Sequence, residues 1–294
     1  PDDEQPARSP SPMPMTATVR QVLRDAIQQL QDRVEDPYTD SHVLLAHSLG
    51  KNRAWLIAHA DDELEPTSLD DFSQLLKQRR QGTPVAYLLG QREFWSLPFS
   101  VTRDTLIPRP ETEHLVERAL ALPVPEIARV LDYGTGSGVI AVVLAKERPG
   151  WTVSAIDCSP GALSVARENA AHHQVGITFL QACDLACVAG QSFDLIVSNP
   201  PYIRQDDPHL SRGDVRLEPA QALASGPEGL DCIRYLIENA ATCLTPDGYL
   251  LLEHGYDQAL AVRGLMQQQG FSDVTTDRDF AGHERVTSGQ WPAK

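Results

Sequence analysis

The sequence predicts an α/β domain with a mostly parallel sheet, preceded by a small all-helical domain. Two observations support this prediction. From Ala128 onward, short apolar stretches rich in β-branched residues alternate with helical patterns, as is typical of βαβ units whose parallel sheet is covered on both faces. From Thr16 to about Gly90, apolar residues recur at three- and four-residue spacing, which predicts helices that pack against one another.

Composition narrows the classes of protein and partner. The chain has 294 residues, 41% of them hydrophobic, and a net charge of −15. Because a protein that grips duplex nucleic acid needs a basic face, this charge argues against such a partner. Five scattered cysteines without a metal-ligand spacing predict a reducing compartment and no structural metal. No apolar run approaches the roughly 18 residues of a membrane span, and no signal-peptide core is present. We therefore expect a cytoplasmic protein that does not bind membranes.

The first 90 residues divide into a tail and a helical domain. Residues 1–15 are rich in Pro and Ser and predict a disordered tail. Residues 16–90 predict helices, the first capped by Thr16, and the last ending in basic residues that suit the helix dipole. The domain contains no catalytic constellation, so we expect it to recognise or position a substrate. Its apolar stripes are Val19, Leu23, Ile27 and Leu30; Val43, Leu44, Ala46 and Leu49; and Leu69, Phe72, Leu75 and Leu76.

A β-hairpin linker and a catalytic domain follow. Residues 91–107 contain an alternating apolar and polar stretch, which predicts a hairpin that joins the two domains. The catalytic domain is expected over 108–294 and begins with a helix from Glu111 to Leu122. The further strands are predicted at 128–132, 151–156, 177–181, 193–197, 247–253, 272–277 and 284–290. The further helices are predicted near 138–147, 160–173, 228–244 and 256–269.

An Asn-Pro-Pro-Tyr segment stands directly after the predicted strand 193–197 and is the most informative motif of the chain. Pro200 and Pro201 remove two backbone donors, so the loop presents bare carbonyl oxygens. Together with the side-chain oxygen of Asn199, these can accept both hydrogens of a planar –NH2 group, while Tyr202 lies against its face. The segment predicts a site for a planar amine or amide. A simple turn and a short polyproline ligand are the alternatives.

A glycine-rich turn, Gly134-Thr135-Gly136-Ser137-Gly138, follows the predicted strand 128–132. Glycines allow a tight turn and let the backbone approach a ligand closely. The segment lacks the Lys-Ser/Thr of a P-loop. Its G-x-G-x-G spacing is tighter than that of dinucleotide-binding folds and leaves less room for a pyrophosphate.

Asp157 ends the next predicted strand, about 20 residues further on. At this spacing a carboxylate can accept hydrogen bonds from ribose hydroxyls, although a helix N-cap is the alternative. A ribosyl cofactor without a pyrophosphate, beside a loop that holds an amine, points to S-adenosylmethionine.

Four segments together resemble the HemK/PrmC family of protein-(glutamine) methyltransferases, which modify peptide chain release factors. The resemblance runs from about residue 16 onward. The segments are REFWSLPFSVTRDTLIPRPETE (92–113), LDYGTGSGVIA (131–141), SNPPYI (198–203) and DVRLEPAQALASGPEGLD (214–231). It implies a class I S-adenosylmethionine-dependent methyltransferase fold, which is Rossmann-like, with a seven-stranded sheet.

The resemblance also implies roles for single residues. The residues implied to bind the cofactor are Gly134, Thr135, Gly136, Ser137 and Gly138 on the methionine side, Asp157 at the ribose, and Asn199. The segment Asn199 to Tyr202 is implied to hold the substrate glutamine, with Asn199, Pro200 and Tyr202 as catalytic residues. In the family, an acidic-aromatic pair often faces the adenine after the third strand. This chain has Cys183-Asp184 there, and Asp184 is the expected adenine contact.

The predicted function is methylation of the glutamine in the Gly-Gly-Gln motif of class 1 peptide chain release factors by a monomeric enzyme. The alternative is a nucleic-acid methyltransferase that uses the same loop on the exocyclic amino group of a flipped adenine or cytosine. The acidic composition and the lack of a basic stripe argue against this alternative. A non-catalytic module that binds the cofactor is the third hypothesis, and the presence of both motifs argues against it.

Overall fold

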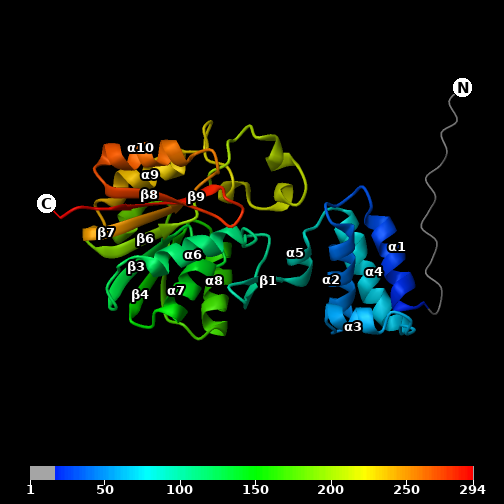
Figure 1. Ribbon diagram of the computed structural model, residues 1–294. Helices are drawn as coiled ribbons and strands as arrows, with labels where there is room; N and C mark the ends of the chain where they lie inside the picture. The colour runs from blue at the N-terminus through cyan, green and yellow to red at the C-terminus, as the bar shows by residue number, and fades with distance from the viewer. Residues whose placement is uncertain (1–16, 294) are drawn as a thin grey trace, which may run out of the picture. The chain divides into compact units, whose positions relative to one another are not determined.

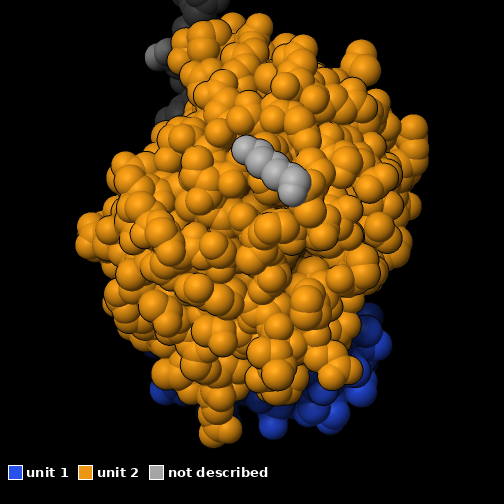
Figure 2. All heavy atoms as spheres, turned by 90° about the vertical axis from the view of Figure 1, so that its left-hand side faces the viewer, with its two compact units in different colours: residues 1–89 blue, residues 90–294 orange. Residues whose placement is uncertain are grey.

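A computed structural model describes residues 17–293 of the chain (Figure 1). The chain divides into two compact units, one that ends at Leu89 and one that begins at Gly90 (Figure 2). The tail predicted for residues 1–15 lies outside the described residues. In the described part of the chain, no helix has both the length and the apolar character needed to cross a membrane.

The first unit is helical and has its own core. Its helices are α1 (Val19–Leu30), α2 (Pro37–Ser48), α3 (Arg53–Ala58), α4 (Pro66–Arg80) and α5 (Val85–Leu89). The predicted stripes contribute Val19, Leu30, Leu44 and Phe72 to this core, each fully buried. The cap of α1 is Thr18, not Thr16, which lies outside the described residues. Thr18 and Gln21 form a capping box, in which each side chain accepts a hydrogen bond from the other's backbone N–H.

Arg79, one of the basic residues in the last turn of α4, also forms contacts inside the helical unit. Its side chain is buried, and its Nε donates to Asp40 Oδ2 at 2.6 Å. Its Nη1 also donates to the carbonyl of Thr83 at 3.2 Å. Arg79 therefore ties α4 to α2 inside the helical unit, because a buried guanidinium requires a carboxylate and further acceptors.

The second unit contains the predicted seven-stranded sheet, and the fold class is confirmed. The strand order is β5-β4-β3-β6-β7-β9-β8, with β9 antiparallel to both of its neighbours and the others parallel. The strands of the sheet are β3 (Ala128–Tyr133), β4 (Trp151–Asp157), β5 (Ile177–Gln181), β6 (Phe193–Ser198), β7 (Leu244–Glu253), β8 (Ser272–Arg278) and β9 (Glu284–Gln290). Each strand lies within three residues of its prediction at either end.

Helices cover both faces of this sheet (Figure 1). The helices are α6 (Glu111–Ala121), α7 (Val139–Glu147), α8 (Pro160–His172), α9 (Asp231–Ala240) and α10 (Ala259–Gln269). Leu115, Val142 and Ala170 of α6–α8 pack on one face, and Ile233 and Val262 of α9 and α10 pack on the other. Since β3, β4, β5 and β6 are parallel, their carboxyl ends meet at one edge, where the sequence motifs were found.

The predicted hairpin consists of β1 (Gln91–Phe94) and β2 (Leu97–Ser100) and belongs to the second unit. Phe94 and Phe99 are buried in the same core cluster as Leu115. Trp95 and Ser96 form the two-residue turn with positive φ values of 56° and 55°, a conformation that suits the twist of a hairpin.

Candidate active site

Two cavities lie at the carboxyl edge of the sheet and share one wall. The larger has a volume of about 200 Å³ and the smaller about 160 Å³. Leu106, Asn199 and Ala222 line both. Six further predicted site residues line one cavity or the other, whereas Thr135, Ser137, Gly138 and Asp184 line neither. Gly134, Gly136, Asp157 and Pro201 line the larger cavity, whereas Pro200 and Tyr202 line the smaller one.

The glycine turn presents backbone, not side chains, to the larger cavity. Gly134 and Gly136 line the cavity with φ values of 72° and 56°, which residues with a Cβ rarely adopt. Thr135 and Ser137 between them are each only 3% exposed. The Thr135 hydroxyl donates inward to Asp132 Oδ2 at 2.6 Å. The alternation of the motif therefore separates a ligand-facing set from a supporting set.

Gly138 closes the turn and has the least space around it of the three glycines in the turn. It precedes α7 with a φ of 84°, and a Cβ there would lie 3.0 Å from Ala166 Cβ. Asn169, also on α8, donates to the Ser137 carbonyl at 2.8 Å and accepts from Ser100 N at 2.8 Å. This buried asparagine was not found from the sequence. It ties the glycine turn to the hairpin.

Asp157 holds the glycine turn and also faces the larger cavity. Its Oδ2 accepts from Gly136 N at 2.8 Å, and its Oδ1 accepts from Ser159 N at 2.9 Å. The N-cap of α8 is Ser159, which accepts from Ala162 N at 3.1 Å. The alternative of Asp157 as that cap is therefore not what the structure shows. Each carboxylate oxygen retains a second lone pair that can accept from a ligand hydroxyl.

Asp132, at the carboxyl end of β3, was not singled out from the sequence. It is fully buried, and its Oδ1 makes no hydrogen bond within the described residues. Its Oδ2 accepts from Thr135 and from Ala141 N. Burial raises the pKa of this carboxyl to about 7. Its apolar surroundings in the sequence gave no sign that an acid there is a structural anchor.

After β5, Cys183 lines the larger cavity and its neighbour Asp184 does not. Ala182 and Cys183 line the larger cavity, together with Cys158 and Cys232. Asp184 is exposed, and its carboxylate caps the short 3-10 helix η1 (Leu185–Val188) by accepting from Ala186 N at 3.0 Å. The adenine contact of Asp184 stays a prediction.

Asn199 stands between the two cavities with a defined partner on one side. Its Nδ2 donates to the hydroxyl of Thr112 at 3.0 Å. Thr112 lies in the first turn of α6 and is 3% exposed. Because the amino end of the amide is held in this way, the opposite end of the side chain presents the acceptor Oδ1.

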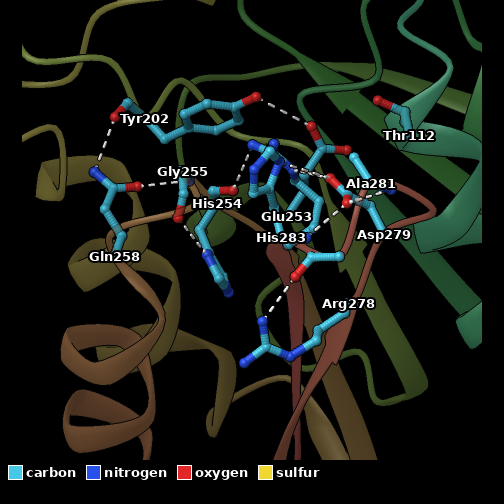
Figure 3. A network of polar contacts seen from close by, with 12 residues as sticks. Thr112, Tyr202, Glu253, His254, Gly255, Gln258, Arg278, Asp279, Ala281 and His283 are labelled. Atoms are coloured by element: carbon cyan, nitrogen blue, oxygen red, sulfur yellow. Dashed lines mark hydrogen bonds and ion pairs between the residues drawn. The ribbon is translucent and has the colours of Figure 1, made fainter.

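Tyr202 is held at both its hydroxyl and its carbonyl (Figure 3). The hydroxyl donates to Glu253 Oε1 at 3.2 Å, and the carbonyl accepts from Gln258 Nε2 at 2.9 Å. Gln258 Oε1 in turn accepts from Gly255 N at 2.8 Å. Burial also raises the pKa of the Tyr202 hydroxyl, so it stays a neutral donor. Glu253 and Gln258 come from β7 and from the residue before α10, segments outside the motif.

The segment after Tyr202 contains the 3-10 helices η2 (Pro208–Ser211), η3 (Val215–Leu217) and η4 (Ala220–Ala222). Ile203, Val215, Ala222 and Leu223 of this segment line the smaller cavity. Glu218 fastens this segment. Its Oε1 accepts from Arg109 at 2.5 Å and its Oε2 from Ile107 N at 2.9 Å. Within the described residues, no group of three or more His, Cys, Asp or Glu side chains could hold a metal ion.

Comparisons with known proteins identify the family of the chain. The PrmC N-terminal domain family matches residues 21–90, and the methyltransferase small domain family matches residues 112–226. The release factor glutamine methyltransferase of Salmonella typhimurium is 48% identical over 92% of this chain and 97% of its own length. The protein of the same name from Escherichia coli is 46% identical over 92% and 97%. A methyltransferase from Pyrococcus furiosus shares the fold, with a TM-score of 0.53, 17% identity, and coverage of 75% of this chain and 100% of its own.

Proposed function

This chain belongs to the release factor glutamine methyltransferase family, and we propose how its second unit performs that reaction. The chain transfers a methyl group from S-adenosylmethionine to the side-chain amide nitrogen of the glutamine in the Gly-Gly-Gln motif of class 1 release factors. The observation that carries the proposal is the position of Asn199. It lies in the wall shared by two cavities, with its amide oriented by Thr112.

The larger cavity fits the cofactor. Gly134 and Gly136 line it with backbone alone, so a ligand can approach closely. Asp157 lines the same cavity and has lone pairs that accept from ribose hydroxyls. When bound, S-adenosylmethionine supplies an electrophilic methyl group on a positively charged sulfur. Thr135, Ser137 and Gly138 support the turn from behind.

The smaller cavity would hold the glutamine side chain. An amide nitrogen is a poor nucleophile because its lone pair is delocalised into the carbonyl. Asn199 Oδ1 and the Pro200 carbonyl accept its two hydrogens, which moves electron density onto nitrogen and fixes its direction of attack. Positive charge develops on the nitrogen in the transition state. The acceptor oxygens therefore stabilise that state more than the ground state.

No strong base has to touch the nitrogen. An amide nitrogen that has gained a methyl group and positive charge is extremely acidic and releases a proton to water. The residues next to Asn199 are consistent with this, since Pro200 and Pro201 carry no titratable group. Tyr202 is kept neutral by burial, and its hydroxyl donates to Glu253, so it does not accept the proton.

The partner, the location and the oligomeric state complete the proposal. Release factors bind RNA and can present basic surfaces to it, and a net charge of −15 suits such a partner. The helical unit before Gly90 would position this protein substrate. We expect a monomeric enzyme in the cytoplasm, where its substrate acts, with no role for duplex nucleic acid.

The test is transfer of labelled methyl from S-adenosylmethionine to a purified release factor, beside a copy with the Gly-Gly-Gln glutamine changed to alanine. We expect label on the first and none on the second. Equal labelling of both would move the target to another residue of the factor. Label on DNA or RNA, with none on either factor, would overturn the proposal in favour of base methylation.

A further inference from the structure

Two buried residues outside the Asn-Pro-Pro-Tyr motif accept hydrogen bonds from its side chains. Thr112 accepts from Asn199 Nδ2 at 3.0 Å, and Glu253 accepts from the Tyr202 hydroxyl at 3.2 Å. The two residues are 3% and 1% exposed. The Thr112 hydroxyl also faces the Glu253 carboxylate and lowers its pKa. The acid thus contacts both ends of the substrate loop, one of them through Thr112.

Thr112 is a neighbour that can donate to the carboxylate of Glu253. Tyr202 approaches Oε1, whereas Oε2 makes no hydrogen bond within the described residues. The charged groups that act on it are Arg285 of β9, which lowers its pKa, and Glu111 of α6, which raises it. Burial outweighs these contributions and raises the pKa to about 7. Glu253 therefore changes its protonation state near neutral pH.

We propose that Thr112 and Glu253 are positioning residues that determine which end of the Asn199 amide faces the substrate. Ionised Glu253 attracts the Thr112 hydroxyl proton, so the Thr112 oxygen is left to accept from Asn199 Nδ2. Oδ1 of Asn199 then faces the smaller cavity. The effect on catalysis rests on the proposed function. The orientation of the Asn199 amide can be measured without substrate.

Protonation of Glu253 removes this bias. A neutral carboxyl no longer draws the hydroxyl proton of Thr112 and can donate a proton of its own. Thr112 can then donate to the oxygen of the Asn199 amide. The Asn199 amide is rotated in this state, and its –NH2 group faces the –NH2 group of the substrate glutamine. Two donors face each other in that state, and no hydrogen bond forms. Turnover therefore requires ionised Glu253 and falls as the pH drops below about 7.

Variants of Thr112 test the positioning role. Thr112→Val keeps the shape but loses the hydroxyl, and we expect kcat to fall about tenfold, the equivalent of one hydrogen bond. Cofactor affinity, measured by calorimetry, should stay within about twofold. Thr112→Ser restores the hydroxyl and should recover kcat to within about threefold of the parent. Thr178→Val, at an exposed position on β5, is the matched control. Equal losses in the Val and Ser variants would show a packing role and overturn the proposal.

The pH arm uses Glu253→Gln, whose amide oxygen can still accept from Thr112 but cannot ionise. The parent should lose kcat as the pH falls from 8 to 6, and the variant should show no such dependence. The Asn199 side-chain amide resonances, followed by NMR without substrate, should titrate near pH 7 in the parent and not in the variant. A titration that persists in Glu253→Gln overturns the proposal. Titrating resonances in a protein that transfers no methyl to any release factor would instead overturn the proposed function alone.

Discussion

The two halves of the site are constructed differently. At the larger cavity, the glycine turn lines the wall with its backbone, and Asp157 holds this turn by accepting from Gly136 N. Around the smaller cavity, the Asn-Pro-Pro-Tyr loop is held by the side chains of Thr112, Glu253 and Gln258. In the first half, Gly136 and Asp157 lie only 21 residues apart in the sequence. The second depends on residues from three distant elements, so its precision rests on tertiary packing.

Each half nevertheless contains a buried acid at the carboxyl end of a strand. Replacing these two acids is expected to give the largest difference between the halves, in the pH dependence of stability. Asp132 and Glu253 have pKa values raised to about 7 by burial. The folded protein therefore keeps these protons between about pH 4 and 7 while the unfolded chain has lost them. Stability consequently decreases as the pH rises through this interval.

We expect Asp132→Asn to be more stable than the parent at pH 8 and equal to it near pH 4. A pKa raised from 3.8 to about 7 corresponds to as much as roughly 4 kcal/mol at pH 8. Glu253→Gln should show a smaller gain, since its pKa rises from 4.5. Denaturant unfolding at several pH values measures both. The raised pKa values would be contradicted if the stability of the parent increased from pH 5 to 8 by more than that of either variant.

Removing the acceptor oxygen of Asn199 should affect turnover and leave cofactor binding largely unchanged. Asn199→Ala should reduce kcat by about a hundredfold or more, the usual cost of losing one preorganised polar contact in a transition state. Affinity for S-adenosylmethionine should change far less, because most of the larger cavity is unaltered. Single-turnover methyl transfer and calorimetry on the same preparation measure the two quantities. Unchanged turnover would contradict the scheme.

The complementary substitution is that of Asp157, at the larger cavity. Asp157→Ala removes the acceptor of Gly136 N and the proposed partner of the ribose. We expect affinity for the cofactor to fall about tenfold or more, equivalent to 1.4 kcal/mol or more, with kcat near the parent value at saturating cofactor. Asp157→Asn keeps one acceptor oxygen, and its cofactor affinity should lie between that of the parent and that of Asp157→Ala. A loss confined to kcat would mean that the two halves are not separable.

Asp184 gives the smallest expected effect. Its carboxylate is exposed and caps η1. Asp184→Ala should therefore change cofactor affinity by less than about threefold if the cap is its only role. A loss of tenfold or more would identify it as the adenine contact predicted from the sequence. Equilibrium binding of S-adenosylhomocysteine decides between the two outcomes.

The sequence predicted the strands and the position of the motifs because buried parallel strands are short, continuous apolar stretches. It did not predict α3, α5 or the 3-10 helices, which are too short to produce a periodic pattern. Nor did it indicate how Arg79 is buried. Thr112 was noted only within a motif and Gln258 not at all, since hydrogen bonds between distant segments leave no local signal. The predicted strand 247–253 ends at Glu253, but the role of this acid depends on its burial, which only the fold determines.

The place of β9 has a consequence for the biosynthesis of this protein. β9 follows every other described strand in the sequence, yet it lies between β7 and β8. Until residues 284–290 emerge from the ribosome, β7 has an unpaired edge, and Glu253 lacks Arg285 beside it. A nascent chain can assemble β3 to β7 but cannot complete the setting of Glu253. Synthesis therefore separates a stage in which the larger cavity forms from a later stage in which the support of the Asn-Pro-Pro-Tyr loop becomes complete.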